Sequence, residues 1–504
     1  MKSSSIKFQN ITDYIYGLIS IPNYYCEFID TFYVQRLRNI RQNPTAFYVF
    51  PSVNNSCFEH SLGTYYLSNN FITNLKNRQN DLDINQTLIN TVSLCGLFNN
   101  IGTVPYLQSF KSFYKEKYKM DYDSKQKAYE IILKLIESKG IDPECITNKN
   151  EDENFDLNII KNIFTNSNNN SKFYEKIVFN PKTEIDCESF DKLNRDAFKF
   201  GGKPYFDHNI LMNSAYIIND EICYNDKDSF CIYDYYNAKY TMETKYYNHR
   251  VSTAINLMIE DVYKLVDNVT PIIDIINNND KYLYFYDSFI HNIKHNEKEN
   301  QYIKKAKLIL NNIDKRNLYT SIGDYYLSND CSEKNIEEFD KFNVNTLIEN
   351  RSKGDVELNV EDIRIKKDII CIGSGNGDPL NDLLLYDKDF NIIKRKVEDV
   401  SKLLPNRFKS RIISVFLTTK DKQKITAAQN ALTNYKNKYK GYTNIYKSEQ
   451  KIEKDKNYVR NFEMDDNFFK ANKDNFKKIS VLGKKRGNEK GYNNYHAQLF
   501  KKKK

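Results

Sequence analysis

Tryptophan is absent from this sequence of 504 residues, and glycine and proline are scarce, at 16 and 10 residues. No run of about 18 consecutive apolar residues occurs, which argues against a membrane-spanning helix. Met1 to Gln9 lacks the apolar centre of a secretory signal. The nine cysteines form no CxxC pair, which excludes zinc-finger spacing. We therefore expect reduced thiols and an intracellular protein, cytoplasmic or nuclear.

The residues that are abundant say little about a partner. Tyr (39 residues), Phe (31) and a net charge of +9 would suit nucleic-acid binding. However, Lys, Asn, Ile, Tyr and Phe all have A/T-rich codons, so drift in an A/T-rich genome explains most of this bias. With 40% hydrophobic and 28% charged residues, the composition is that of an ordinary globular protein.

Hydrophobic periodicity predicts a mainly α-helical chain with a small α/β lobe at its C-terminal end. Apolar residues recur at helical spacing in 29–40, 86–100, 125–138, 186–195, 236–265 and 302–313. Residues 215–233 alternate in short pieces that favour a hairpin. From residue 361 the period falls towards two, and helices are predicted at 403–415 and 426–439. The polar segment 148–172 is predicted to be an Asn-rich insertion around a short helix.

Several short motifs occur in one order along the first half of the chain. They are Ile29-Asp30-Thr31, Gln35-Arg36-Leu37-Arg38, Tyr48-Val49-Phe50-Pro51, Phe58-Glu59-His60-Ser61-Leu62-Gly63, Leu97-Phe98-Asn99-Asn100-Ile101-Gly102 and the segment 185–201. In order and spacing this set closely resembles the HD domain of the sterile-alpha-motif and HD-domain deoxynucleoside triphosphate (dNTP) triphosphohydrolases. The segment 232–251 resembles the long helix that follows, and 400–405 more weakly resembles the C-terminal lobe.

The resemblance, together with the changes of pattern along the chain, predicts four regions. An HD-domain helical fold is expected over 1–290, a helical connector over 291–345 and the α/β lobe over 346–445. A basic, flexible tail is expected over 446–504. The sterile-alpha-motif domain of the family is not found in this sequence, and by resemblance the protein would be a homo-oligomer, a dimer or a tetramer.

The family's reaction splits a dNTP into deoxynucleoside and triphosphate at a divalent metal held by His and Asp side chains. By resemblance His60 matches the first metal ligand, whereas Asn99 and Asn100 replace the His-Asp doublet and Glu188 replaces the last Asp. A neutral carboxamide is a weak ligand and brings no negative charge. A divalent metal is therefore doubtful here, and we interpret His60 first as a structural histidine and second as a ligand.

Other positions carried over from the family are also altered. Thr103 and Gln108 stand in place of two His residues, Ser124 or a neighbour replaces a third, and Cys57 replaces an Arg that contacts substrate. Of the two residues that grip substrate near the last ligand, Lys192 replaces a Tyr and Asp196 is kept, while Lys239 replaces an Arg on the long helix. The residues with the most demanding chemistry are missing, which is typical of a pseudoenzyme.

More residues are retained at the family's regulatory nucleotide site than at its catalytic positions. By resemblance it would contain Asp30, Gln35, Arg38, Phe50, Lys227 and Arg250, with Asn225 in place of an Arg and Gln9 in place of a Lys. Asp can accept hydrogen bonds from guanine, and Arg can bond bidentately or stack, so GTP or a dNTP is a possible ligand. Retention of these residues for packing alone is an equal alternative.

Three further motifs are weaker. The glycine cluster 373–378 follows an apolar run, but Pro379 favours a turn into a strand over a dinucleotide site. His291 and His295 are four residues apart without a suitable carboxylate, which favours a solvated pair. The basic runs 484–486 and 501–504 could bind phosphates or act as a nuclear signal, or simply solubilise the chain end.

The sequence thus favours a catalytically impaired, dGTPase-like homologue that binds nucleotides or a protein partner. An active dNTP triphosphohydrolase with altered ligands is the first alternative. A single-stranded nucleic-acid binder is the second.

Overall fold

The computed structural model describes residues 7–138, 155–165, 171–202, 206–297, 300–327, 332–371, 373, 377–400, 408–439 and 441–445. The predicted tail at 446–504 and its basic runs lie outside these residues. So do residues 374–376 of the glycine cluster and parts of the Asn-rich insertion. The described part of that insertion contains a short helix, α7 (Leu157–Thr165).

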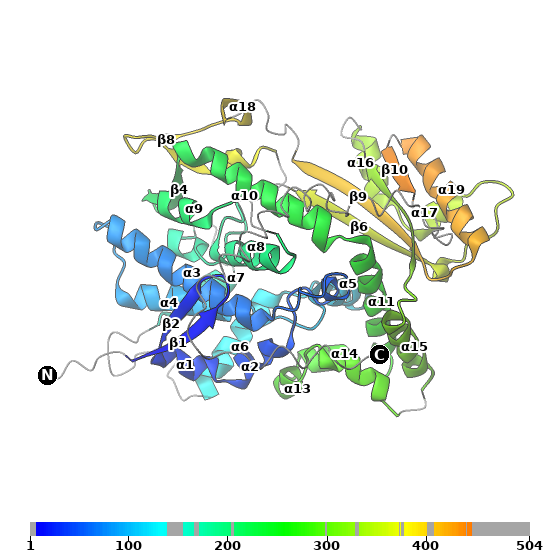
Figure 1. Ribbon diagram of the computed structural model, residues 1–504, viewed down its shortest axis with the longest axis horizontal. Coiled ribbons are helices and arrows are strands. Elements are labelled where there is room, and N and C mark those ends of the chain that lie inside the picture. Colours follow the sequence, from blue (N-terminus) through cyan, green and yellow to red (C-terminus); the bar gives the residue numbers. More distant parts are fainter. Residues whose placement is uncertain are drawn as a thin grey trace, which may run out of the picture. The chain divides into compact units, whose positions relative to one another are not determined.

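Three helices form the centre of the N-terminal region and begin at residues that cap them. They are α3 (Cys57–Arg78), α4 (Gln86–Phe98) and α8 (Cys187–Lys199) (Figure 1). The side chains of Ser56, Asn85 and Asp186 accept hydrogen bonds from backbone N–H groups in the first turns of these helices. Such capping fixes where each helix starts and therefore where the side chains of the site lie.

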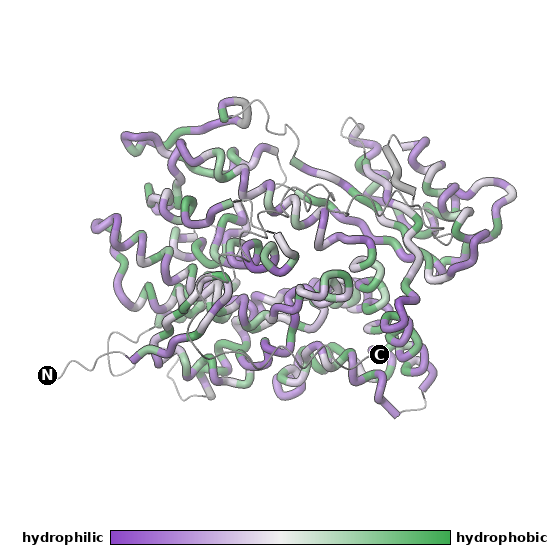
Figure 2. Tube along the Cα trace, viewed as in Figure 1, coloured by the Kyte–Doolittle hydropathy of each residue, from purple (hydrophilic) through white to green (hydrophobic). Residues whose placement is uncertain are grey.

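Further helices surround this centre, and the fold is mainly α, as predicted. They are α1 (Asn23–Ile29), α2 (Phe32–Gln35), α5 (Leu107–Tyr118), α6 (Ser124–Ser138), α9 (His208–Ser214), α10 (Ser229–Met242), α11 (Arg250–Asp267), α12 (Ile272–Ile276), α13 (Asn279–Leu283), α14 (Ser288–Asn292) and α15 (Gln301–Asp314). Hydrophobic and hydrophilic residues alternate along these helices, as expected of elements with one buried face (Figure 2). No described helix is both long and apolar enough to cross a membrane.

The continuous helix predicted over 236–265 is wrong. Helix α10 ends at Met242, a π-helical turn η6 (Glu243–Tyr247) follows, and α11 begins at Arg250. The His249 side chain accepts a hydrogen bond from the N–H of Val251, which makes it the cap of α11. The break brings the ring of Tyr247 to the candidate site.

An N-terminal hairpin, β1 (Phe8–Asp13) and β2 (Gly17–Pro22), precedes the helices. Ile19 and Ile21 of β2 are fully buried in the main hydrophobic core. The sequence predicted no strand here, because the apolar run is only a few residues long.

The C-terminal lobe contains an antiparallel sheet in the order β10-β5-β9-β6, packed against α19 (Lys422–Tyr439). Its strands are β5 (Thr320–Leu327), β6 (Ile363–Cys371), β9 (Lys409–Leu417) and β10 (Gly441–Ile445), with α16 (Glu333–Lys341) and α17 (Val344–Glu349) between β5 and β6. The segment predicted as a helical connector therefore supplies strand β5. The helix predicted over 403–415 is wrong, because its described part forms strand β9, whereas the helix predicted over 426–439 lies within α19.

A second small sheet joins early and late parts of the chain. The predicted hairpin is β3 (Tyr216–Ile218) with β4 (Glu221–Asn225), and β4 pairs in parallel with β7 (Leu384–Tyr386). Strand β8 (Ile392–Ile393) completes the order β3-β4-β7-β8, and a short helix α18 (Val397–Val400) follows. The turn Pro379–Asp382 leads into β7, as predicted for the end of the glycine cluster.

Candidate functional site

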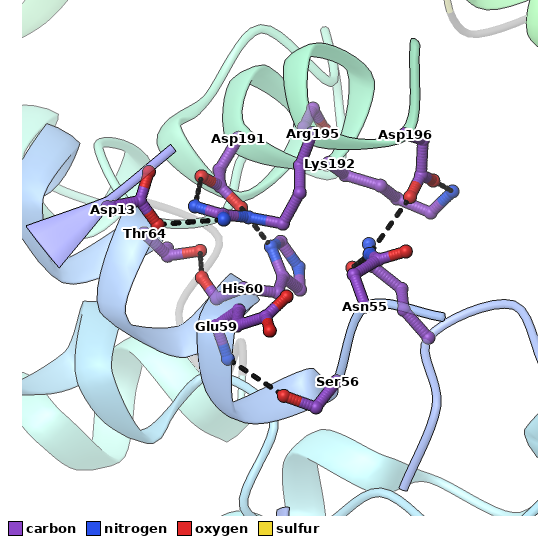
Figure 3. A network of polar contacts seen from close by, with 12 residues as sticks. Asp13, Asn55, Ser56, Glu59, His60, Thr64, Asp191, Lys192, Arg195 and Asp196 are labelled. Carbon is purple, nitrogen blue, oxygen red and sulfur yellow. Dashed lines mark hydrogen bonds and ion pairs between the residues drawn. The ribbon is translucent and has the colours of Figure 1, made fainter. Parts of the chain in front are cut away.

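His60 and Asp191 meet where helices α3 and α8 cross. The imidazole Nδ1 of His60 lies 2.7 Å from Oδ2 of Asp191, and both side chains are buried (Figure 3). The close crossing depends on Gly63, one turn along α3, because a Cβ there would overlap the Asp191 carboxylate. With Nδ1 committed to Asp191, only Nε2 of His60 could bind a ligand. A carboxylate partner of this kind is how proteins orient histidines that bind metals.

Arg195 fixes that carboxylate. Its Nε and Nη2 donate to Asp191 at 3.0 and 2.9 Å, and its Nη1 donates to Oδ2 of Asp13 at 2.8 Å. Burial alone would raise the pKa of Asp191, but the charge of Arg195 outweighs it, with help from His60, and holds the pKa at about 2. Sequence reasoning missed this network, although an Asp and an Arg four residues apart on a helix signal such a pair.

Asn99 and Glu188 come together around the amine of Lys125. Asn99 caps the C-terminal end of α4, and its Oδ1 accepts a hydrogen bond from Nζ of Lys125, the second residue of α6. The same Nζ lies 3.2 Å from Oε2 of Glu188 on α8. Burial alone would raise the pKa of Glu188, but the charge of Lys125 outweighs it and holds the pKa below its usual value. Sequence reasoning did not single out Lys125.

These residues do not fit a divalent metal. Asn99 and Asn100 supply neutral amides, and the Nδ2 of Asn100, a donor, is buried without an acceptor in the described part of the chain. An ammonium lies among the possible ligands, and it would repel a second cation. The described residues also include no group of three or more His, Cys, Asp or Glu side chains that could hold an ion.

The carboxylate of Asp196, a predicted substrate-binding residue, is already hydrogen-bonded to other side chains of the protein. It is fully buried and accepts hydrogen bonds from Tyr247 Oη at 2.6 Å, Asn43 Nδ2 at 2.8 Å, Lys192 Nζ at 3.3 Å and Asn55 Nδ2 at 3.4 Å. The ammonium of Lys192 also lies 3.8 Å from the centre of the Tyr247 ring. A carboxylate has about four lone-pair sites, so these four donors saturate Asp196.

The remaining predicted catalytic and substrate residues make contacts within the fold. Lys239 pairs with Glu184, and Gln108 accepts a hydrogen bond from Asn256 at 3.4 Å. The backbone oxygen of Thr103 accepts from Arg36 and Tyr282. Cys57 is buried in the first turn of α3, where burial raises the pKa of its thiol.

Two of the predicted regulatory residues, Gln35 and Arg38, are joined by a hydrogen bond, and Phe50 lies close to the start of α11, which carries Arg250. The Nε of Arg38 donates to Oε1 of Gln35 at 2.7 Å, and its guanidinium lies 3.7 Å from the centre of the Phe58 ring. Asp30 is exposed at the end of α1. The ring of Phe50 contacts that of His249, which precedes the exposed Arg250. Lys227 is exposed, and Asn225 caps the turn that contains it. Gln9 accepts a hydrogen bond from the thiol of Cys26, which lies one helical turn before Asp30.

The chain is similar to curated proteins along most of its length, although no family model matches it. The deoxynucleoside triphosphate triphosphohydrolase SAMHD1 homolog of Dictyostelium discoideum is 27% identical over 444 residues, covering 86% of this chain and 82% of the relative. SAMHD1 of Xenopus laevis is 27% identical, covering 83% of this chain and 72% of the relative. An HD domain-containing protein of Acanthamoeba polyphaga mimivirus, L394, is 28% identical over 61% of this chain.

The names of these relatives agree with the resemblance carried by the motifs around His60. The chain is therefore similar, over most of its length, to SAMHD1-type deoxynucleoside triphosphate triphosphohydrolases and, over 61% of its length, to an HD domain-containing protein.

Proposed function

We propose that this protein is a catalytically impaired member of the family, a pseudoenzyme that binds nucleotides and acts through that binding or through a protein partner. The observation that carries the proposal is the saturation of Asp196 by four internal donors. A substrate could reach this carboxylate only by displacing side chains that already satisfy it, and each displaced donor would need a new acceptor.

The donor set supports the same conclusion. Hydrolysis at a metal requires an ion that polarises the phosphate or activates a water. At the corresponding positions the chain offers His60, two neutral amides and a Glu188 that is paired with Lys125. Such a set should bind Mn²⁺ or Fe²⁺ weakly. The amides carry no charge, and the negative charge of Glu188, which could compensate the ion for its lost hydration, is already neutralised by Lys125.

Nucleotide binding is proposed at the regulatory residues. The guanidinium of Arg38 lies over the Phe58 ring and donates a hydrogen bond to Gln35, so it is partly ordered before a ligand arrives. Asp30 is exposed nearby in sequence and could accept from the edge of a guanine. GTP or a dNTP is the expected ligand, and a homo-oligomer, a dimer or tetramer, is the expected assembly by analogy with the family.

The first experiment tests catalysis. The purified full-length protein is incubated with dGTP and Mn²⁺ in the presence of GTP, and triphosphate is measured against a blank without protein. We expect no release above the blank and far less than one bound metal per chain. Metal-dependent release of triphosphate would overturn the proposal and favour the alternative, an active hydrolase with altered ligands at His60 and Glu188.

The second experiment tests nucleotide binding by thermal shift. A ligand at about 100 times its Kd stabilises a protein by about 2.7 kcal/mol, so GTP should raise the melting temperature clearly. Arg38→Ala should abolish the shift, whereas Lys305→Ala, at an exposed position of α15, should keep it. If neither GTP nor any dNTP shifts the melting temperature, the binding part of the proposal fails. A salt-sensitive gel shift with oligo-dT would then favour a single-stranded nucleic-acid binder.

A further inference from the structure

The amine of Lys125 lies among the segments that carry the family's ligand positions. Its Nζ donates to the side-chain oxygen of Asn99, and the Asn99 carbonyl oxygen lies 3.4 Å from it. On the opposite side it pairs with Glu188 at 3.2 Å. One ammonium thus links α6 both to the end of α4 and to α8.

This pair differs from an ordinary surface ion pair. The side chains of Lys125 and Glu188 are only 16% and 22% exposed. The ammonium also lies 4.8 Å from the centre of the Phe179 ring, which favours a cation at that point. Removing one partner of a pair with such low exposure would leave the other charge without compensation.

The position of Lys125 in its helix is unfavourable by itself. It stands in the first turn of α6, where the positive end of the helix dipole repels a cation. Asp123, whose Oδ1 accepts from the Lys125 N–H at 2.8 Å, offsets only part of that repulsion. The contacts with Asn99 and Glu188 therefore stabilise an ammonium that its position in the helix alone would disfavour.

Backbone packing fixes the start of α6, where Lys125 lies. Gly102, in the loop after Asn100, packs so closely on α6 that a Cβ would overlap the carbonyl oxygen of Ser124. The start of α6 is therefore held against the loop that carries the two asparagines. The Lys125 side chain is directed to the site by packing as well as by charge.

We propose that the Lys125 ammonium is a built-in cation that takes the place of the divalent ion and holds the ends of α4, α6 and α8 together without metal. This inference rests on the proposed function, since a metal-loaded site would leave no room for it. It predicts that Lys125, and not only the loss of ligands at Asn99 and Asn100, keeps divalent ions out.

The test restores the missing ligands in the full-length chain with and without the lysine. The Asn99→His, Asn100→Asp variant is compared with the same variant carrying Lys125→Met, and Mn²⁺ binding is measured by calorimetry and metal analysis. We expect Lys125→Met to tighten Mn²⁺ binding by at least about tenfold, because it removes a positive charge from the ligand positions. The matched control is Lys134→Met in the same background, since Lys134 is exposed further along α6, and it should change nothing.

A second measurement covers the case in which the restored sites fold badly. In the wild-type background without metal, Lys125→Met should lower the melting temperature by about 4 °C. Lys125→Arg should keep it. Glu188→Gln added to Lys125→Met should cost little more, because the pair is already broken.

The outcomes separate this inference from the proposed function. Equal Mn²⁺ affinity with and without Lys125 overturns the built-in cation and leaves the impaired enzyme standing. Additive effects of Lys125→Met and Glu188→Gln on the melting temperature overturn it as well. Stoichiometric Mn²⁺ in the wild-type protein overturns both.

Discussion

Arg195 is fully buried, and its charge is matched by the carboxylates of Asp191 and Asp13. Removing one partner of a buried charge pair leaves the other without compensation, which costs about 3–5 kcal/mol. Asp191 also carries the only hydrogen bond that orients the His60 ring in the described part of the chain. This residue therefore serves the stability of the fold and the geometry of the site at once.

The variant Asp191→Asn tests this role. Its unfolding free energy in urea should fall by about 3–5 kcal/mol relative to the wild type, because the guanidinium loses its two-point partner. Asp121→Asn is the control, since the Lys115–Asp121 pair has side chains 69% and 79% exposed. That change should cost less than about 0.5 kcal/mol. Similar effects of the two substitutions would show that burial of the network contributes nothing special.

Asp287 links stability to pH. Burial raises the pKa of this carboxyl to about 6, although the backbone N–H and charge of Arg41 lower it in part. Its Oδ1 is buried and has no hydrogen-bond donor in the described chain. Because the folded-state pKa lies above the unfolded value, the folded protein takes up the proton first as pH falls. The stabilising contribution of this group is complete in acid and is lost as pH rises through about 6.

Between pH 8 and pH 5 the wild type should therefore gain about 1.4 kcal/mol of stability relative to Asp287→Asn, which cannot titrate. The measurement is the difference between the two unfolding free energies in urea at each pH. A difference that stays constant over this range, or grows towards high pH, would contradict the assignment of a raised pKa to Asp287.

At the scale of single elements, close packing between loops and helices positions the site. Gly102 separates the Asn100 loop from α6, and a side chain there would meet the Ser124 oxygen and the Ala128 nitrogen. Backbone atoms cannot move aside as a flexible side chain can, so α6 would have to shift as a whole. The Lys125 ammonium would then lose its place beside Glu188.

Gly102→Ala should thus lower the unfolding free energy by about 2–3 kcal/mol, the cost of overpacking a tight contact. Gly202→Ala is the matched control, since its Cβ would meet nothing closer than the Ala197 carbonyl oxygen at 3.5 Å. That change should have little effect. Two glycine variants of equal stability would mean that the α6 contact is looser than the structure describes.

The elements that the sequence predicted well are long apolar or amphipathic helices. The helix predicted over 86–100 is α4, whose long apolar run is buried from Leu88 to Phe98, and the one predicted over 125–138 is α6, whose apolar residues follow a helical period. Strand β9 was predicted as part of a helix instead. It lies between two neighbouring strands, and its last three residues, 415–417, are all buried, so it shows no alternation of period two.

The site shows the same limit. The motif order identified His60, Asn99 and Glu188, and the structure brings Asn99 and Glu188 to one amine. The amine itself could not be predicted, since Lys125 and Glu188 are 63 residues apart and no local pattern couples them. Saturation of Asp196 likewise depends on the break after α10, which hydrophobic periodicity does not mark.

At the scale of the whole described chain, the helical region and the C-terminal lobe are joined by charge and by a shared sheet. Arg364 on β6 donates through Nε to both oxygens of Asp261 on α11, at 3.0 and 2.9 Å. Tyr319, which precedes β5, donates to the same carboxylate at 2.6 Å. The parallel pairing of β4 with β7 adds a backbone link between the two regions. Both regions should therefore unfold together.

Arg364→Gln tests whether the charge contact maintains that coupling. The Asp261 side chain is only 9% exposed, so loss of the guanidinium leaves a buried carboxylate with Tyr319 as its remaining donor, at a cost of about 3 kcal/mol. In calorimetry the wild type should unfold in one main transition, whereas the variant should unfold earlier and show a separate low-temperature shoulder from the C-terminal lobe. Lys422→Gln, at an exposed position on α19, should keep the wild-type profile. If Arg364→Gln melts as a single transition at the wild-type temperature, the β4–β7 pairing and the surrounding apolar contacts must suffice to couple the two regions, and the Arg364–Asp261 pair would serve another purpose.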